Sequence, residues 1–161
     1  LLQRFDIAAQ TKWPNDVVVG DRKICGILPE LPRRGTPEGG PPLVVVGVGL
    51  NVGMTRDEAA RIDQPATSIL IEGGRSATAA DLLPELLAAL APRLDSWTGG
   101  GFSALRKDWE AHCTGLGQQV QVIDGDSRRQ GTLTGFGDAG QLLLTEAGDV
   151  VEIWTGHLRK V

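Results

Sequence analysis

The segment "TKWPNDVVVGDRKICGIL", from Thr11 to Leu28, places an acid and a lysine within an otherwise apolar stretch. Val17–Val19 and Ile24–Leu28 are short runs of β-favouring residues on either side of Gly20-Asp21. A glycine followed by an aspartate suits a two-residue type II′ turn. The segment therefore predicts a β-hairpin that carries both charged side chains.

The turn determines which residues of this hairpin face one another. Counting outward from it, we expect Val19 opposite Arg22, Val18 opposite Lys23, and Asp16 opposite Cys25. Because side chains alternate across a strand, one face should carry Asp16, Val18, Lys23 and Cys25, with Asn15 on the other face near Gly26.

Two interpretations of Asp16 and Lys23 remain open. In the first, the two side chains form an ion pair on a solvated face, which contributes little to stability. In the second, both side chains reach one ligand that lies between them. The apolar neighbours favour a ligand, because charged groups in such a setting are costly without partners. Gly26 inside a strand also suggests a bulge or the close approach of a ligand to the backbone.

A second motif, "GVGLNVG" from Gly47 to Gly53, follows the apolar run Leu43–Val48. That run predicts a strand buried on both faces. The motif is not a dinucleotide fingerprint, because Val52 stands where the third glycine is required. Its glycines either permit close packing of strands or leave room for a flat ligand beside Asn51, which offers a donor and an acceptor.

The rest of the chain divides into a helical and a β-rich part. Pro32–Pro42 predicts a loop. The segment Ala77–Trp97 has the apolar spacing of an amphipathic helix, and Asp81 within it is the expected N-cap. Phe102–His112 predicts a second helix. From Gln118 onward, short strands separated by glycine turns predict a small antiparallel barrel, with a boundary near residues 113–117.

Composition excludes several classes of protein. The 161 residues carry a net charge of −4, which argues against a nucleic-acid partner. The two cysteines, Cys25 and Cys113, have no metal-ligand spacing and form no disulfide framework, so we expect no metal site and a reducing cytoplasmic location. No apolar run reaches the roughly 18 residues of a membrane span, so no membrane association is expected.

Three motifs together resemble the biotin–protein ligase family: "KWPND" (Lys12–Asp16), "RKICGIL" (Arg22–Leu28) and "GVGLNV" (Gly47–Val52). The resemblance continues through "ATSIL" (Ala66–Leu70) and into the β-rich part. It implies a mixed α/β (α+β) catalytic domain akin to class II aminoacyl-tRNA synthetases over residues 1–113. A small barrel of the Src-homology-3 type is implied over residues 114–161.

The resemblance also implies an activity. Such ligases join biotin to ATP, with Mg²⁺, to make biotinyl-5′-adenylate, and pass the biotinyl group to a lysine of a biotin carboxyl carrier domain. Lys23 matches the family's essential lysine, and Asp16 matches the acid proposed to act on the carrier lysine. The implied substrate-binding residues are Lys23, Asn15, Gly26, Ile27, Gly47, Gly49 and Asn51, with backbone contacts to biotin from Gly26 and Ile27.

One part of the family pattern is absent from this sequence. The Ser/Thr-rich biotin segment and the G-R-G-R-x-G-R loop have no match, and "PRRGTPEGG" (Pro32–Gly40) follows the lysine rather than preceding it. The chain also begins at Leu1 without methionine. We therefore expect the N-terminal part of the catalytic domain to be missing, and we expect weak biotin binding and reduced stability for this chain alone. A non-catalytic carrier-docking module and a lipoate-ligase-like acyltransferase remain alternatives, and homodimer formation is left open.

Overall fold

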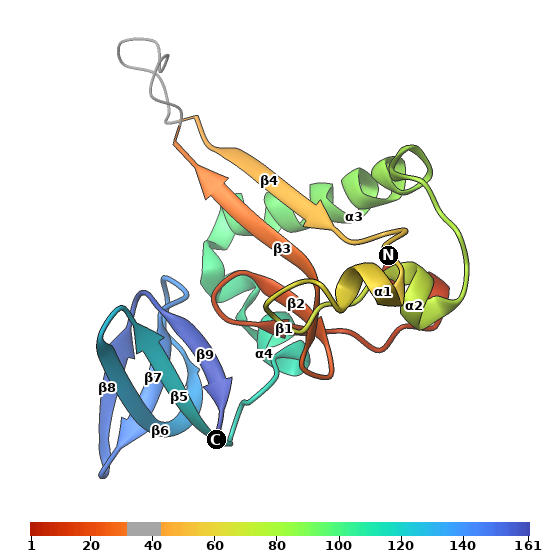
Figure 1. The fold of residues 1–161 in the computed structure, drawn as a ribbon. Helices are drawn as coiled ribbons and strands as arrows, with labels where there is room; N and C mark the ends of the chain where they lie inside the picture. The colour runs from red at the N-terminus through yellow and green to blue at the C-terminus, as the bar shows by residue number, and fades with distance from the viewer. Residues whose placement is uncertain (32–42) are drawn as a thin grey trace.

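The computed structural model describes residues 1–31 and 43–161. The predicted loop Pro32–Pro42 lies outside the described residues. Two antiparallel sheets and several helices make up the described part, which confirms the mixed α and β class. Figure 1 shows the C-terminal sheet in blue at one end of the molecule, with the long helix α3 and the β3–β4 arm away from it.

The N-terminal sheet has the strand order β1-β2-β3-β4. Its strands are β1 (Gln10–Lys12), β2 (Asp16–Val19), β3 (Arg22–Glu30) and β4 (Val45–Leu50), and each pair is antiparallel. Strands β2 and β3 form the predicted hairpin. Gly20 adopts a φ of 61° at its turn, as a type II′ turn requires of its first central residue.

The register of this hairpin is partly as predicted. Val19 faces Arg22 and Val18 faces Lys23, but a bulge follows and Asp16 faces Gly26 instead of Cys25. Because a bulge inserts one residue, it moves every later side chain of the strand to the opposite face. Cys25 therefore joins the core on the other side of the sheet, and the prediction that it shares a face with Lys23 was wrong.

The helices differ from the prediction mainly at their ends. They are η1 (Leu2–Phe5), α1 (Arg56–Ala59), α2 (Ile69–Gly73), α3 (Ala79–Gly100), η2 (Phe102–Ala104) and α4 (Arg106–His112). Thr78, not Asp81, caps α3, because Asp81 is the third helical residue of a capping box that Thr78 begins. The predicted helix Phe102–His112 is divided into η2 and α4. In the part of the chain that the structure describes, no helix is long and apolar enough to cross a bilayer.

The C-terminal sheet has five antiparallel strands in the order β8-β7-β6-β5-β9. They are β5 (Gln119–Asp124), β6 (Ser127–Phe136), β7 (Leu142–Glu146), β8 (Asp149–Ile153) and β9 (His157–Lys160). These strands occupy the region where the sequence predicts a barrel. The assignment to the Src-homology-3 type, the likeness to class II synthetases and the division into domains at residue 113 stay predictions.

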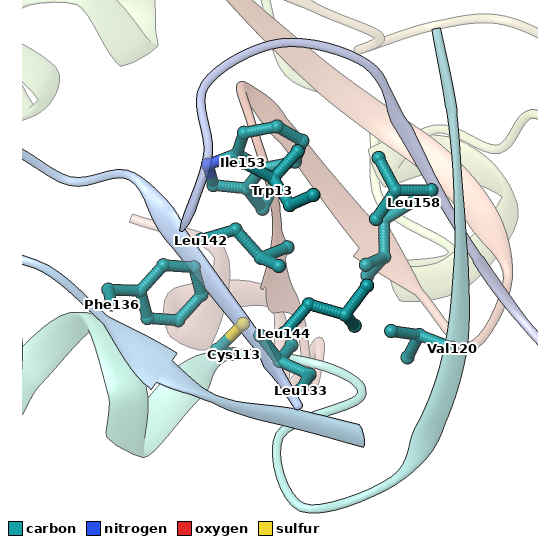
Figure 2. Packing of buried hydrophobic residues seen from close by; sticks show 10 residues of the cluster. Trp13, Cys113, Val120, Leu133, Phe136, Leu142, Leu144, Ile153 and Leu158 are labelled. Carbon is teal, nitrogen blue, oxygen red and sulfur yellow. The ribbon is translucent and has the colours of Figure 1, made fainter. Parts of the chain in front are cut away.

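The core of the C-terminal sheet includes a side chain from the N-terminal part of the chain. Trp13 is buried there together with Phe136, Leu142, Ile153 and Leu158, as Figure 2 shows. Its indole Nε1 donates to the carbonyl of Gly140 at 3.3 Å. Because Trp13 lies three residues before Asp16, this core anchors the start of the charged hairpin.

Two apolar surfaces of the described residues are exposed, and one of them was predicted to be buried. Strand β4 lies at the edge of its sheet, and Val45 and Val46 each keep 51% of their surface exposed. The prediction that Leu43–Val48 is buried on both faces was therefore wrong, because β4 contacts only β3 in the described sheet. On α3, Leu82 is buried, whereas Leu83, Leu87, Leu94 and Trp97 are exposed.

Candidate functional site

Lys23 and Asp16 meet on one face of the hairpin, as predicted. The Lys23 Nζ lies 2.6 Å from Oδ1 of Asp16, and the two side chains keep 31% and 23% of their surface exposed. The contact lacks the angles of a hydrogen bond, and Oδ1 is buried without another partner among the described residues. A half-buried ammonium and an incompletely satisfied carboxylate are suited to a polar ligand, because buried polar groups normally have hydrogen-bond partners.

Gly26 makes room for this pair. A Cβ built on Gly26 would lie 3.0 Å from both Cε and Nζ of Lys23, and 3.6 Å from Oδ1 of Asp16. The lysine side chain therefore crosses over the backbone of its own strand, β3, at the residue that faces Asp16. Sequence reasoning expected a bulge or a ligand at this glycine. The bulge lies between Lys23 and Cys25 rather than at Gly26, and the absent side chain of Gly26 leaves space for the lysine itself.

Gly49 and Gly47 continue this face onto the neighbouring strand. Gly49 is opposite Gly26, and Gly47 is opposite Leu28. A Cβ at Gly49 or Gly47 would meet only a backbone oxygen, at 3.8 Å and 3.5 Å respectively, which are ordinary contacts. Packing among the described residues therefore does not require these glycines. Their missing side chains leave uncovered backbone beside Gly26, and the exposed side chain of Leu28 borders it opposite Gly47.

Two other predicted residues have their backbone groups engaged. The Ile27 N–H donates to the carbonyl of Asn15 at 2.8 Å, which joins these residues across the end of the hairpin. The side chain of Ile27 alternates with Gly26 and points to the opposite face of β3. Ile27 lines a cavity of about 830 Å³ with Pro29, Trp97 and Trp109, and neither Lys23 nor Asp16 reaches it.

Asn51 lies behind the lysine strand. Its side-chain amide donates to the carbonyls of Thr67, at 3.0 Å, and Lys23, at 3.4 Å. The backbone of Lys23 is also hydrogen-bonded to residues 65–67: its N–H donates to the carbonyl of Pro65, and its carbonyl accepts from the N–H of Thr67. The sequence analysis did not assign this segment to the site. The "ATSIL" stretch (Ala66–Leu70), which the sequence connects to the site only through the resemblance, contains Thr67.

A smaller cavity of about 320 Å³ borders the ion pair itself. Its walls come from both sheets: Lys12, Asp16 and Lys23 from the N-terminal sheet, and His157 and Arg159 from β9. Asp21 also lines it, so three lysine or arginine side chains face two aspartates, a small positive excess that favours an anion weakly. The C-terminal sheet thus forms one wall of the space beside Lys23.

The cysteines do not contribute reactive groups to this face. Burial raises the pKa of the Cys25 thiol, although the nearby Lys23 ammonium opposes that rise. Burial also raises the pKa of Cys113, to about 11. In the described ranges, no group of three or more His, Cys, Asp or Glu side chains is placed to hold a metal ion.

Comparison with known proteins relates the chain to a defined set of enzymes. The model of the biotin/lipoate A/B protein ligase family matches residues 4–51. The biotin–acetyl-CoA-carboxylase ligase of Paracoccus denitrificans is 33% identical over 137 residues, which cover 83% of this chain and 55% of that protein. This chain is a relative of the biotin–protein ligases. The bifunctional ligase/repressor BirA of Escherichia coli (strain K12) is 32% identical over 150 residues, which cover 91% of this chain and 44% of BirA.

Solved structures of biotin–protein ligases agree with this relationship. The biotin–protein ligase of Aquifex aeolicus in complex with biotin and ATP superimposes with a TM-score of 0.81 at 25% identity, and the match covers 99% of this chain and 65% of that chain. The apo structure of the same ligase also has a TM-score of 0.81 at 25% identity. This chain spans about half the length of the curated biotin–protein ligases it matches.

Proposed function

We propose that this chain carries part of the active site of a biotin–protein ligase. The protein would use ATP to convert biotin into biotinyl-5′-adenylate and would transfer the biotinyl group to a lysine of a biotin carboxyl carrier domain. The main support is the placement of the Lys23 ammonium, 2.6 Å from Asp16 and over Gly26, beside the uncovered backbone of Gly49 and Gly47. Biotin and ATP are bound in the related Aquifex structure, which supports these substrates here.

In the first step, an oxygen of the biotin carboxylate attacks the α-phosphorus of ATP. The new bond is a carboxyl–phosphate anhydride, and the bond to the bridging oxygen breaks so that pyrophosphate leaves with the electron pair. Negative charge builds up on the α-phosphate oxygens during this step, and an ammonium held in place stabilises it. Lys23 supplies that ammonium, Mg²⁺ arrives with ATP, and the backbone of Gly26, Gly47 and Gly49 lies under the substrates.

In the second step, the amine of the carrier lysine attacks the acyl carbon, and AMP leaves. The amine has an ordinary pKa of about 10.4, so it must lose a proton before it attacks. Asp16 is placed to orient this amine or to accept its proton, because its carboxylate borders the cavity beside Lys23 and keeps 23% of its side-chain surface exposed. Asn15, Ile27 and Asn51 hold the surrounding backbone through their hydrogen bonds. Because the Ile27 N–H is engaged, the proposed contacts to biotin come from Asn15 and from the backbone at Gly26.

Biotin-dependent exchange of labelled pyrophosphate into ATP tests the first step. We expect exchange in the complete protein with biotin, and no exchange when biotin is omitted or replaced by lipoate. Exchange with lipoate alone would identify a lipoate-ligase-like acyltransferase. Binding of a carrier domain without binding of biotin or ATP, measured by calorimetry, would identify a carrier-docking module. Either result would reject the proposed function.

A further inference from the structure

The backbone of Lys23 is held by a segment far along the chain. The Lys23 N–H donates to the carbonyl of Pro65 at 2.9 Å, and the Lys23 carbonyl accepts from the N–H of Thr67 at 2.9 Å. Ala66, between them, forms a parallel bridge with Lys23. The position of the lysine backbone therefore depends on where residues 65–67 lie.

One carboxylate oxygen ties residues 65–67 to the lysine strand. Thr67 is fully buried, and its hydroxyl donates to Oε1 of Glu72. The same oxygen accepts from Nη2 of Arg22 at 2.7 Å and from Nε of Arg22 at 3.1 Å. Arg22 is the residue directly before Lys23, so Glu72 links both sides of the bridge. Hydrogen bonds that involve ionised groups are about twice as strong as neutral ones.

Glu72 is itself held in place by its helix. Ser68 caps α2 by accepting from the N–H of Ile71 at 3.1 Å, and the Ser68 hydroxyl donates to the carbonyl of Met54 at 2.6 Å. Ile69, the first residue of the helix, is fully buried in the N-terminal core. The Glu72 side chain keeps only 16% of its surface exposed. These contacts leave the carboxylate little freedom to move.

We propose that Glu72 is a positioning residue for Lys23, acting through Thr67 and Arg22. The inference rests on the proposed function for its catalytic consequence, but the positioning itself does not require any ligand. A reacting group must be held within about 0.5 Å of its productive position, which needs supporting hydrogen bonds of this kind. Loss of the Glu72 carboxylate should loosen the bridge at Lys23 while the core stays folded.

Amide hydrogen exchange measured by NMR tests this proposal without substrates. In Glu72→Gln and in Thr67→Val, we expect the amides of Lys23 and Thr67 to exchange about tenfold faster or more, because local opening determines their protection. Thr67→Ser retains the hydroxyl and should keep normal exchange. Arg22→Gln, at an exposed position that cannot disrupt the core, should give a smaller increase of about threefold.

Glu146→Gln is the matched control. In the C-terminal sheet, Glu146 accepts from Nε of Arg129 through Oε1 at 3.1 Å and from Nη2 through Oε2 at 2.8 Å, so it forms an arginine–carboxylate pair that uses both carboxylate oxygens. Glu146→Gln should leave the exchange rate of the Lys23 amide unchanged. If the Lys23 and Thr67 amides exchange at the normal rate in both Glu72→Gln and Arg22→Gln, or if Glu146→Gln accelerates them equally, the proposal is wrong.

Adenylate formation in the complete protein provides the second measurement. We expect Glu72→Gln to slow biotinyl-adenylate formation about tenfold at saturating substrates, with little change in biotin affinity, because a displaced group reacts slowly. If Glu72→Gln forms biotinyl-adenylate at the normal rate, Glu72 does not support catalysis by positioning Lys23. If the unaltered protein makes no adenylate but the amide exchange responds as expected, the proposed function fails and the positioning of the Lys23 backbone is supported.

Discussion

The ammonium of Lys23 lies over Gly26 and 2.6 Å from the carboxylate of Asp16. Space above the strand allows this contact, since a Cβ at Gly26 would lie 3.0 Å from the lysine nitrogen. The absence of a side chain at Gly26 thus determines where the Lys23 ammonium lies beside Asp16.

Gly26→Ala should impair chemistry more than folding. The new methyl group meets the flexible end of Lys23, so the ammonium moves while the backbone remains in place. We expect adenylate formation to slow by about tenfold to a hundredfold, with a nearly unchanged thermal midpoint. Gly53→Ala is the control, because nothing lies within 4 Å of a Cβ built there. Equal rates in both variants would show that the space over Gly26 does not matter.

Asp16→Asn should affect the second step selectively. The amide keeps the shape of the carboxylate but cannot accept the proton of the carrier lysine. When the variant is given preformed biotinyl-adenylate, we expect transfer to the carrier domain to slow by about a hundredfold or more. Asp126→Asn, at an exposed turn of the C-terminal sheet, should transfer normally. Transfer at the normal rate by Asp16→Asn would remove Asp16 from this step.

Trp13→Ala should destabilise the protein strongly. The indole is buried in the core of the C-terminal sheet, so its removal leaves a cavity. We expect the free energy of unfolding to fall by about 3–5 kcal/mol, measured by urea denaturation. Trp154→Ala is the matched control, because Trp154 is 60% exposed, and should change stability much less. Similar losses in the two variants would contradict the assignment of Trp13 to this core.

The two thiols should resist alkylation in the folded protein. Burial raises the pKa of Cys113 to about 11, so at pH 8 only about one thousandth of this thiol is thiolate, the reactive form. Iodoacetamide should therefore modify it far more slowly than in the urea-unfolded chain. Because the unfolded thiol ionises first, stability should fall as the pH rises from about 9 toward 11. Native alkylation at the unfolded rate would contradict this burial.

The hairpin shows how far local sequence determines the site. The turn at Gly20-Asp21 and the pairs beside it follow from local preferences, so they could be predicted. The position of the bulge could not, because the turn alone predicts an uninterrupted register, whereas the structure shifts the register between Val17 and Val18 and so turns Cys25 into the core. The prediction that Asp16 and Lys23 share a face was nevertheless correct, because both side chains lie on the same side of the sheet as Val18.

Burial was harder to predict than secondary structure. Val45 and Val46 form a strand, as their β-branched side chains favour, but they are exposed because β4 has only one neighbour in the described sheet. The position of Trp13 shows the same limit. Only the folded chain shows that the partners of this indole come from the C-terminal sheet.

The central claim is that Lys23 stabilises the charge that develops during adenylate formation. The most direct measurement is the single-turnover rate of biotinyl-adenylate formation by Lys23→Ala in the complete protein, with biotin affinity measured in parallel. We expect adenylate formation to be abolished while biotin binding weakens much less, because the ammonium acts mainly on the transition state. Adenylate formation at the normal rate by Lys23→Ala would contradict the assignment.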